Sequence, residues 1–129
     1  MKKVIVLVLL FLAGSVFIHA QNAAPDWINK DPFVKDGIIY FSGYARMSTM
    51  SLSMQTAQSR AFTNLMRYLN SNTSQRLPSI PADAEVKHTF TYERIEGTIS
   101  GVKVVENWTD DSRGVHILCS CDGVEIKRN

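Results

Sequence analysis

Apolar residues recur at intervals of three and four between Ser48 and Asn70, which is the spacing of one face of an α-helix. The predicted buried stripe consists of Met54, Ala57, Ala61, Leu65 and Leu69. Ser48 or Ser51 can provide the N-cap. The nearby methionines, Met47, Met50 and Met54, are expected to fill the core, because Met packs well into irregular gaps.

Alternating strand-forming residues precede the helix at positions 37–45. Ile39, Phe41 and Gly43 share one face of this strand, and Tyr40, Ser42 and Tyr44 share the other. A glycine inside a strand often marks a bulge or the close approach of another backbone. Small residues on the helix stripe, Ala57 and Ala61, would let the helix axis lie close to a sheet.

Further strand patterns follow the helix at positions 86–95, 102–108 and 115–121. Residues 93–96, at the end of the first of these strands, could instead be helical. Gly97 and Gly101 bracket a predicted bend. Residues 110–114 form a predicted hairpin loop, and 124–129 are a short last strand or a frayed end.

The order of strand, long helix and strand meander predicts the α+β class, with one long helix packed on an antiparallel sheet of three to four strands. We expect a signal peptide at residues 1–20, an extended lead-in at 21–36 and a single α+β domain at 37–129. Trp27 and Phe33 of the lead-in are expected to pack against the domain. A single helix would leave the second face of the sheet uncovered.

The N-terminal segment has the layout of a secretory signal peptide. Lys2 and Lys3 precede an apolar run from Val4 to Ile18, and Ala20 stands before the polar residue Gln21. The run is short for a membrane span, which needs about 20 residues. Cleavage is therefore expected, with an uncleaved anchor as the alternative. The protein is predicted to be exported, in the periplasm, associated with the outer membrane or secreted, with no stable membrane span after cleavage.

Removal of this segment takes two of the 14 basic residues and none of the 12 acidic ones, so the net charge falls to about zero. A nucleic-acid partner is therefore not expected. The chain contains no G-x-S-x-G elbow, P-loop or dinucleotide-binding glycine pattern. A non-enzymatic protein without a cofactor or metal is expected, and a small hydrolase with an unrecognised site remains an alternative.

Four segments of the chain carry a family resemblance. They are the Pro-Asp-Trp-Ile lead at 25–28, the strand at 40–45, the Ala-Gln-Ser-Arg-Ala helix segment at 57–61 and the terminal hairpin at 108–121. Together they resemble the Lpp-twenty type of bacterial envelope lipoprotein, and are also similar to the N-terminal domain of the flagellar assembly protein FlgT. The resemblance implies a small, non-catalytic envelope domain that acts by contact, with an envelope protein or self-association as its partner.

The chain departs from the lipoprotein pattern at the predicted cleavage site. Lipid-anchored members have a cysteine there, whereas this chain has Ala20 and Gln21, and its first cysteine is Cys119. The resemblance therefore does not extend to lipid attachment by that route.

Cys119 and Cys121 are the two cysteines of the chain and would face the same side of a strand. Three interpretations are open: an apolar row facing the helix, a disulfide, or a thiol pair that binds a soft metal or cycles between redox states. Strand geometry separates their Cα atoms by about 6.5 Å, near the upper limit for a disulfide. His116 would point away from Cys119, and is expected to be a surface or strand-face residue.

Tyr40, Tyr44 and Trp108 are the candidate contact surface. If Ile39 and Phe41 face the helix, Tyr40 and Tyr44 face away from it, and tyrosine and tryptophan are enriched at protein interfaces. Ordinary cross-strand packing is the alternative. The sequence thus favours an exported contact protein, with a thiol or metal module at Cys119 and Cys121 as its rival.

Overall fold

The computed structural model describes residues 23–71 and 76–128. The predicted signal peptide at 1–20 lies outside these residues. The described elements are, in chain order, β2 (Phe33–Lys35), β3 (Ile38–Ala45), α2 (Met50–Asn70), β4 (Lys87–Tyr92), β5 (Ile95–Ser100), β6 (Lys103–Thr109), β7 (Val115–Cys121) and β8 (Gly123–Arg128).

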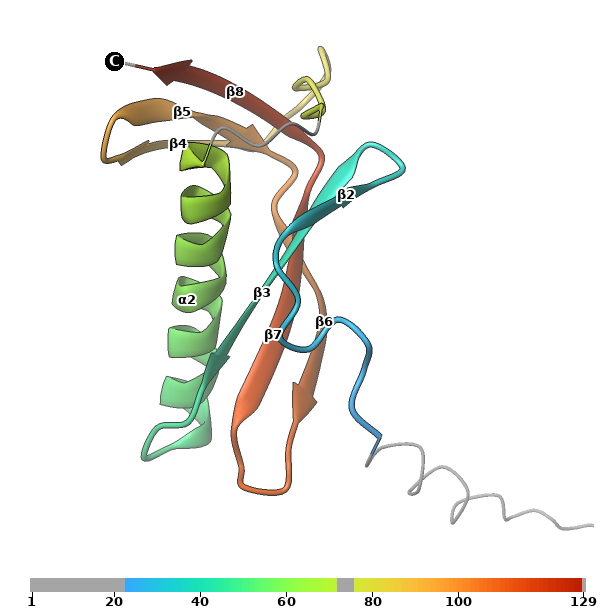
Figure 1. Cartoon of the computed structure of the whole chain (residues 1–129), viewed down its shortest axis with the longest axis vertical. Helices are drawn as coiled ribbons and strands as arrows, with labels where there is room; N and C mark the ends of the chain where they lie inside the picture. The colour runs from blue at the N-terminus through green and yellow to red at the C-terminus, as the bar shows by residue number, and fades with distance from the viewer. Residues whose placement is uncertain (1–22, 72–75, 129) are drawn as a thin grey trace, which may run out of the picture.

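The strands form two antiparallel sheets, one of four strands in the order β2-β3-β7-β6 and one of three in the order β4-β5-β8. Helix α2 runs along the four-stranded sheet, and the three-stranded sheet lies at the C-terminal end of the helix (Figure 1). The predicted α+β class, with a long helix on an antiparallel sheet, is confirmed. The second sheet was not predicted.

The core lies between α2 and the helix-facing side of β3 and β7. Its fully buried members include Ile39, Phe41, Ala57, Ala61, Leu65, Leu69, Ile117, Cys119 and Cys121. Gly43 is essential to this packing, because a Cβ atom at this position would stand 2.2 Å from the carbonyl oxygen of Ala57 and 2.4 Å from the amide nitrogen of Ala61. The expected close packing of the helix on the sheet at Ala57 and Ala61 is therefore confirmed, and Gly43 marks the close approach of another backbone rather than a bulge.

The helix begins slightly later than expected and uses a different cap. Thr49 is the N-cap, and its hydroxyl accepts a hydrogen bond from the Leu52 amide at 3.1 Å, so neither Ser48 nor Ser51 has this role. The expectation that Met47, Met50 and Met54 fill the core is wrong, because all three are at least 40% exposed. The buried residue of the first turn is instead Ser53, which is 1% exposed.

The predicted strand at 86–95 contains β4 and the turn of a hairpin, whose second strand, β5, was not predicted. Its turn contains Glu93 in the left-handed conformation, with φ of 52°, so the sequence carries no glycine to mark it. Gly97 lies within β5 instead of at a bend, where a Cβ would stand 2.1 Å from the carbonyl oxygen of Glu125. Residues 123–128 form a strand rather than a frayed end, and β8 pairs with β5.

A single residue, Asp122, separates β7 from β8, so one long stretch of extended chain passes through both sheets. Two hydrogen bonds hold this junction. The Ser100 hydroxyl donates to Oδ1 of Asp122 at 2.7 Å, and the Asp122 amide donates to the Ser100 carbonyl at 3.0 Å. The two sheets are thus joined by a continuous strand and a buried serine.

Candidate contact surface

The sheet face opposite α2, here called the outer face, is partly covered by the lead-in. Trp27 is only 6% exposed, and its Nε1 donates a hydrogen bond to Oε2 of Glu106 on β6 at 3.1 Å. Leu118 and Ser120 on the outer face of β7 are also buried. The expectation of an uncovered second face is therefore wrong, whereas the expected packing of Trp27 and Phe33 against the domain is confirmed, with Phe33 stacked on Tyr40.

An irregularity in β6 decides which side chains reach the outer face. The pairing with β7 shifts between Val104 and Glu106, so Val105 is an extra residue. Because side chains alternate along a strand, one extra residue moves all later side chains to the opposite face. Glu106 and Trp108 consequently lie on the outer face, opposite Leu118 and His116 of β7.

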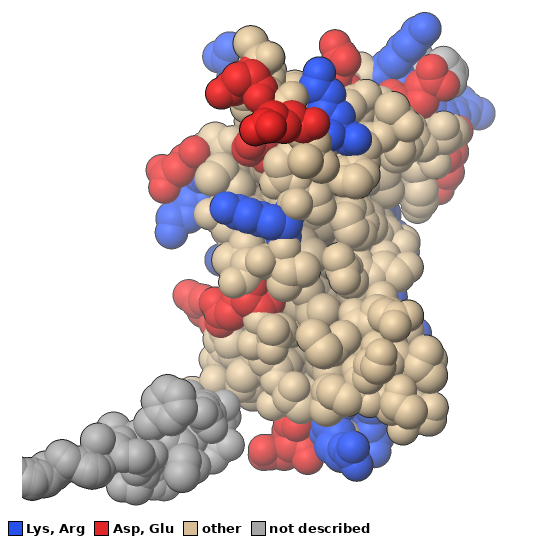
Figure 2. Space-filling model, turned by 180° about the vertical axis from the view of Figure 1, so that it is seen from behind, with Lys and Arg blue, Asp and Glu red and all other residues tan. Residues whose placement is uncertain are grey.

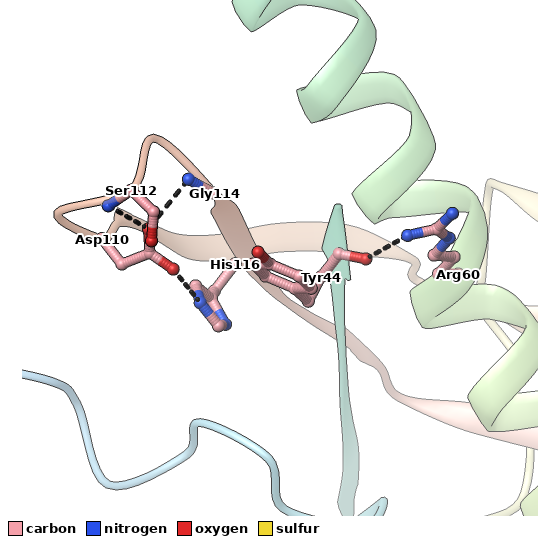
Figure 3. A network of polar contacts seen from close by, with 6 residues as sticks. All are labelled: Tyr44, Arg60, Asp110, Ser112, Gly114 and His116. Atoms are coloured by element: carbon pink, nitrogen blue, oxygen red, sulfur yellow. Dashed lines mark hydrogen bonds and ion pairs between the residues drawn. The ribbon is translucent and has the colours of Figure 1, made fainter. Parts of the chain in front are cut away.

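His116 is the centre of an aromatic cluster at the hairpin end of the outer face. Its ring lies 4.5 Å from the ring of Tyr44 and 5.3 Å from that of Trp108, measured between centroids. Its Nε2 lies 3.2 Å from Oδ2 of Asp110. Figure 3 shows the imidazole between the tyrosine ring and the carboxylate. His116 thus links Tyr44 to Trp108, although the sequence predicted it only as a surface or strand-face residue.

Asp110 positions this cluster by closing the β6–β7 hairpin. Its Oδ1 accepts hydrogen bonds from the amides of Ser112 and Gly114, both at 2.9 Å. The Gly114 amide lowers the pKa of Asp110 below its usual 3.8, and this effect is opposed by desolvation and reinforced by His116 and Ser112. The predicted hairpin loop is confirmed, and its first aspartate is held ionised beside His116.

Tyr40 does not belong to this cluster. It pairs with Phe33 of β2, and the two rings stack at 5.3 Å, at the opposite end of β3 from Tyr44. The three predicted contact residues therefore occupy two places. Tyr44, which is 39% exposed, is the most accessible of the cluster around His116.

A groove of about 640 Å³ adjoins the cluster. The lead-in forms one wall, α2 forms the other, and β3 lies between them (Figure 1). The lining includes Asn29, Lys30, Asp31 and Pro32 of the lead-in, Ser42, Gly43 and Tyr44 of β3, Asn64, Arg67, Tyr68 and Ser71 of the helix, and His116.

The groove exists because β2 pairs with β3 only as far as Tyr40. The chain before β2 contains Pro32, which has no amide hydrogen to continue a ladder. In the described part of the chain, no strand pairs with this edge of β3 beyond Tyr40. Side chains of the helix satisfy its carbonyls instead. Asn64 Nδ2 donates to the Ser42 carbonyl at 2.8 Å, and Arg60 Nη1 donates to the Tyr44 carbonyl at 3.0 Å (Figure 3).

Cys119 and Cys121 lie apart from this surface. Both are free, buried and directed toward the helix, as the apolar-row interpretation expected. Burial raises the pKa of Cys119 to about 11 and that of Cys121 to about 12, with the charge of Asp122 adding to the second. Among the described residues, no group of three or more His, Cys, Asp or Glu side chains could hold a metal ion.

Comparisons with known proteins found no match to a family model, to a curated protein or to a solved structure. Within the described residues, no helix has both the length and the apolar character needed to cross a membrane. The Lpp-twenty-like resemblance thus remains a prediction from sequence motifs.

Sequence analysis alone could not identify Asn64, Arg67 or His116 as surface components. His116 shares its strand face with Leu118 and Ser120, and only the three-dimensional pairing with Tyr44 reveals its position. Asn64 and Arg67 read as ordinary polar residues of a helix. Asn64 could have been identified only from the edge of β3 at Ser42, where its side chain donates a hydrogen bond. Recognising that edge requires the order of strands in the sheet.

Proposed function

We propose that this is an exported, non-enzymatic protein of the cell envelope that acts by contact, and that it binds an extended segment of a partner protein in the groove beside β3. The observation that carries the proposal is the unpaired edge of β3 at the floor of a groove that also exposes Tyr44. An exposed strand edge is a general template for an added strand. The signal-like N-terminus and the Lpp-twenty-like motifs support the envelope location.

The groove favours a partner segment with acidic side chains. Lys30 and Arg67 line it against the single acidic residue Asp31. The sequence adds to this imbalance, because no Asp or Glu occurs between Asp36 and Asp83, a stretch that contains all of β3 and α2. Complementary charge would orient the segment and speed its association.

The partner strand would have to displace the helix side chains that now occupy the edge. Asn64 and Arg60 each donate one hydrogen bond to a β3 carbonyl, and an incoming backbone amide can replace either donor. In the free protein these side chains protect the edge from unspecific pairing, which native proteins generally avoid. Binding then exchanges hydrogen bonds rather than creating buried unpaired groups.

Site-specific photocrosslinking in intact cells tests the proposal. A photoreactive amino acid at Tyr44 or Ser71 should give a discrete adduct whose partner peptide, identified by mass spectrometry, is extended and acidic. The same amino acid at the exposed Thr89 of β4, away from the groove, is the control. Equal adducts at all three positions, or none at Tyr44 and Ser71, would contradict the proposed site.

A matched pair of variants tests the role of the aromatic surface. Tyr44→Ser should abolish the adduct at position 71, whereas Tyr40→Ser removes the same side chain from the same strand face outside the groove and should retain it. Retained association in both variants would exclude Tyr44 as a contact. N-terminal sequencing of the protein from a periplasmic fraction independently tests cleavage after Ala20 and the envelope location.

A further inference from the structure

Three methionines gather at the N-terminal end of α2, in the opposite half of the helix from the groove. Met47, Met50 and Met54 are 43%, 40% and 40% exposed, respectively. Methionine is among the residues most often buried, so three exposed thioethers within eight residues are an informative group. The fourth described methionine, Met66, is buried at 9% exposure and provides an internal comparison.

The local fold brings the chain at the three methionines together in the first turns of the helix. Met50 and Met54 are one turn apart, which places their Cβ atoms at about 5–6 Å from each other. Met47 precedes the helix, but its amide donates a hydrogen bond to the hydroxyl of Ser53 at 2.8 Å. Ser53 is itself only 1% exposed and lies between Met50 and Met54 in the sequence. This bond folds the chain at Met47 back against the first turn.

The segment that carries the three methionines supplies no carboxylate, imidazole or thiolate ligand. The stretch between Asp36 and Asp83 contains no Asp, Glu, His or Cys, so the three thioether sulfurs have no competing ligand on their own segment. Thioethers select soft monovalent ions such as Cu(I), whereas Mg²⁺, Ca²⁺ and Zn²⁺ require oxygen, imidazole or thiolate ligands. Figure 2 shows a broad uncharged surface over much of the lower half of the molecule, the half in which the helix begins.

Electrostatics sharpen this selectivity. The positive end of the helix dipole and the neighbouring Arg46 both oppose a bound cation. An ion held mainly by charge would therefore not bind here, and binding must come from the bonds between sulfur and the metal. Only a soft metal forms such bonds with thioethers.

We propose that Met47, Met50 and Met54 form a surface site for one soft monovalent metal ion, Cu(I) in the first instance, coordinated by three thioether sulfurs. The site is independent of the proposed function. Ten residues of helix separate Met54 from Asn64 of the groove, which corresponds to about 15 Å along the axis.

Anaerobic titration with Cu(I), kept reduced by ascorbate and buffered by a chromogenic Cu(I) chelator, tests the proposal on the purified protein. Labelling the methionine methyl groups with ¹³C reports each thioether separately. We expect uptake of one equivalent, with shifts of the Met47, Met50 and Met54 methyl signals and an unchanged Met66 signal. Ag(I) should reproduce the shifts, and Zn²⁺ should not.

Leucine variants separate the thioethers from other donors. M47L/M50L/M54L keeps the apolar volume while removing the sulfurs, and should lose Cu(I) uptake without a change in the circular dichroism spectrum. M66L is the matched control and should retain full uptake. Undiminished uptake by the triple variant, or methyl signals that do not respond, would overturn the site. Uptake that instead consumes the thiols of Cys119 and Cys121 would also overturn it.

Discussion

Gly43 of β3 and Ala57 of α2 are in direct backbone contact, since a Cβ on Gly43 would stand 2.2 Å from the Ala57 carbonyl oxygen. The atoms nearest to this Cβ belong to the helix backbone at Ala57 and Ala61, not to a flexible side chain that could move aside. The helix and the strand would have to separate to admit a single methyl group.

The variant Gly43→Ala should therefore lower the free energy of unfolding by about 1–3 kcal/mol, the usual cost of overpacking a core. Urea denaturation followed by circular dichroism measures this loss. Ser42→Ala, at the next position of the same strand, is the control and should cost less. Equal stability of the Gly43→Ala variant and the parent would mean that the helix is not held against β3 as described.

Trp27 is expected to be the main attachment of the lead-in. Trp27→Ala removes a buried indole and should cost about 3–5 kcal/mol, as large aromatic truncations do. Trp27→Phe keeps a ring but loses the hydrogen bond to Glu106, and should cost only about 1–2 kcal/mol. The comparison of both variants by thermal unfolding separates burial from hydrogen bonding, and identical losses would refute that division.

Deletion of Val105 should restore a regular ladder between β6 and β7 and keep Glu106 and Trp108 on the outer face, because Val105 is the extra residue of β6. The Trp27–Glu106 hydrogen bond and the packing of Trp108 on His116 should therefore be retained. We expect tryptophan fluorescence and near-UV circular dichroism close to those of the parent, and the loss of both signals would mean that Val105 is needed for the pairing of β6. Val105→Thr keeps the chain length, and should leave both spectra as in the parent.

The stability of the hairpin should fall in acid. The pKa of Asp110 is lowered in the folded protein, mainly by the Gly114 amide, so its contribution is present above the ordinary value of 3.8 and is lost as the pH falls through the lowered folded value. Unfolding measured from pH 6 downward should show this loss. Asp110→Asn cannot ionise and should lack this part of the pH dependence. An identical pH profile in both proteins would exclude Asp110 as its source.

The two thiols should be inert in the folded protein. With pKa values of about 11 and 12, Cys119 and Cys121 carry almost no thiolate at pH 8 and are covered by the core. A disulfide reagent such as dithionitrobenzoate should react with neither thiol under native conditions and with both in guanidinium. Rapid modification of the native protein would favour the thiol interpretation of this pair.

The sequence predicted the features that depend on local periodicity. The stripe containing Ala57, Ala61 and Leu65 identified the buried helix face, and alternation in β3 assigned Phe41 inward and Tyr44 outward. Gly43 within a strand indicated a bulge or a close backbone approach, and the structure shows the close approach, to Ala57 and Ala61.

Features that depend on where one element ends relative to another were not predictable in this way. Met54 follows the predicted buried stripe by periodicity, yet it is 40% exposed, and its neighbour Ser53 is the buried residue at that end of the helix. Glu93 turns a hairpin without a glycine, and Gly97 and Gly101 predicted a bend where β5 lies, so the second sheet was missed. The extra residue Val105 determines the face on which Trp108 lies. Valine is an ordinary strand residue, so the sequence does not indicate this irregularity.

The position of β7 in the sheet has a consequence for how the chain matures. Both β3 and β6 need β7 between them, and β7 at residues 115–121 follows both of them in the chain. During synthesis the four-stranded sheet therefore lacks its middle until β7 has been added, and long-range pairing of this kind forms late. Until then the apolar face of α2 has only part of its sheet to pack on, so an unfinished chain exposes the surfaces that the folded protein buries.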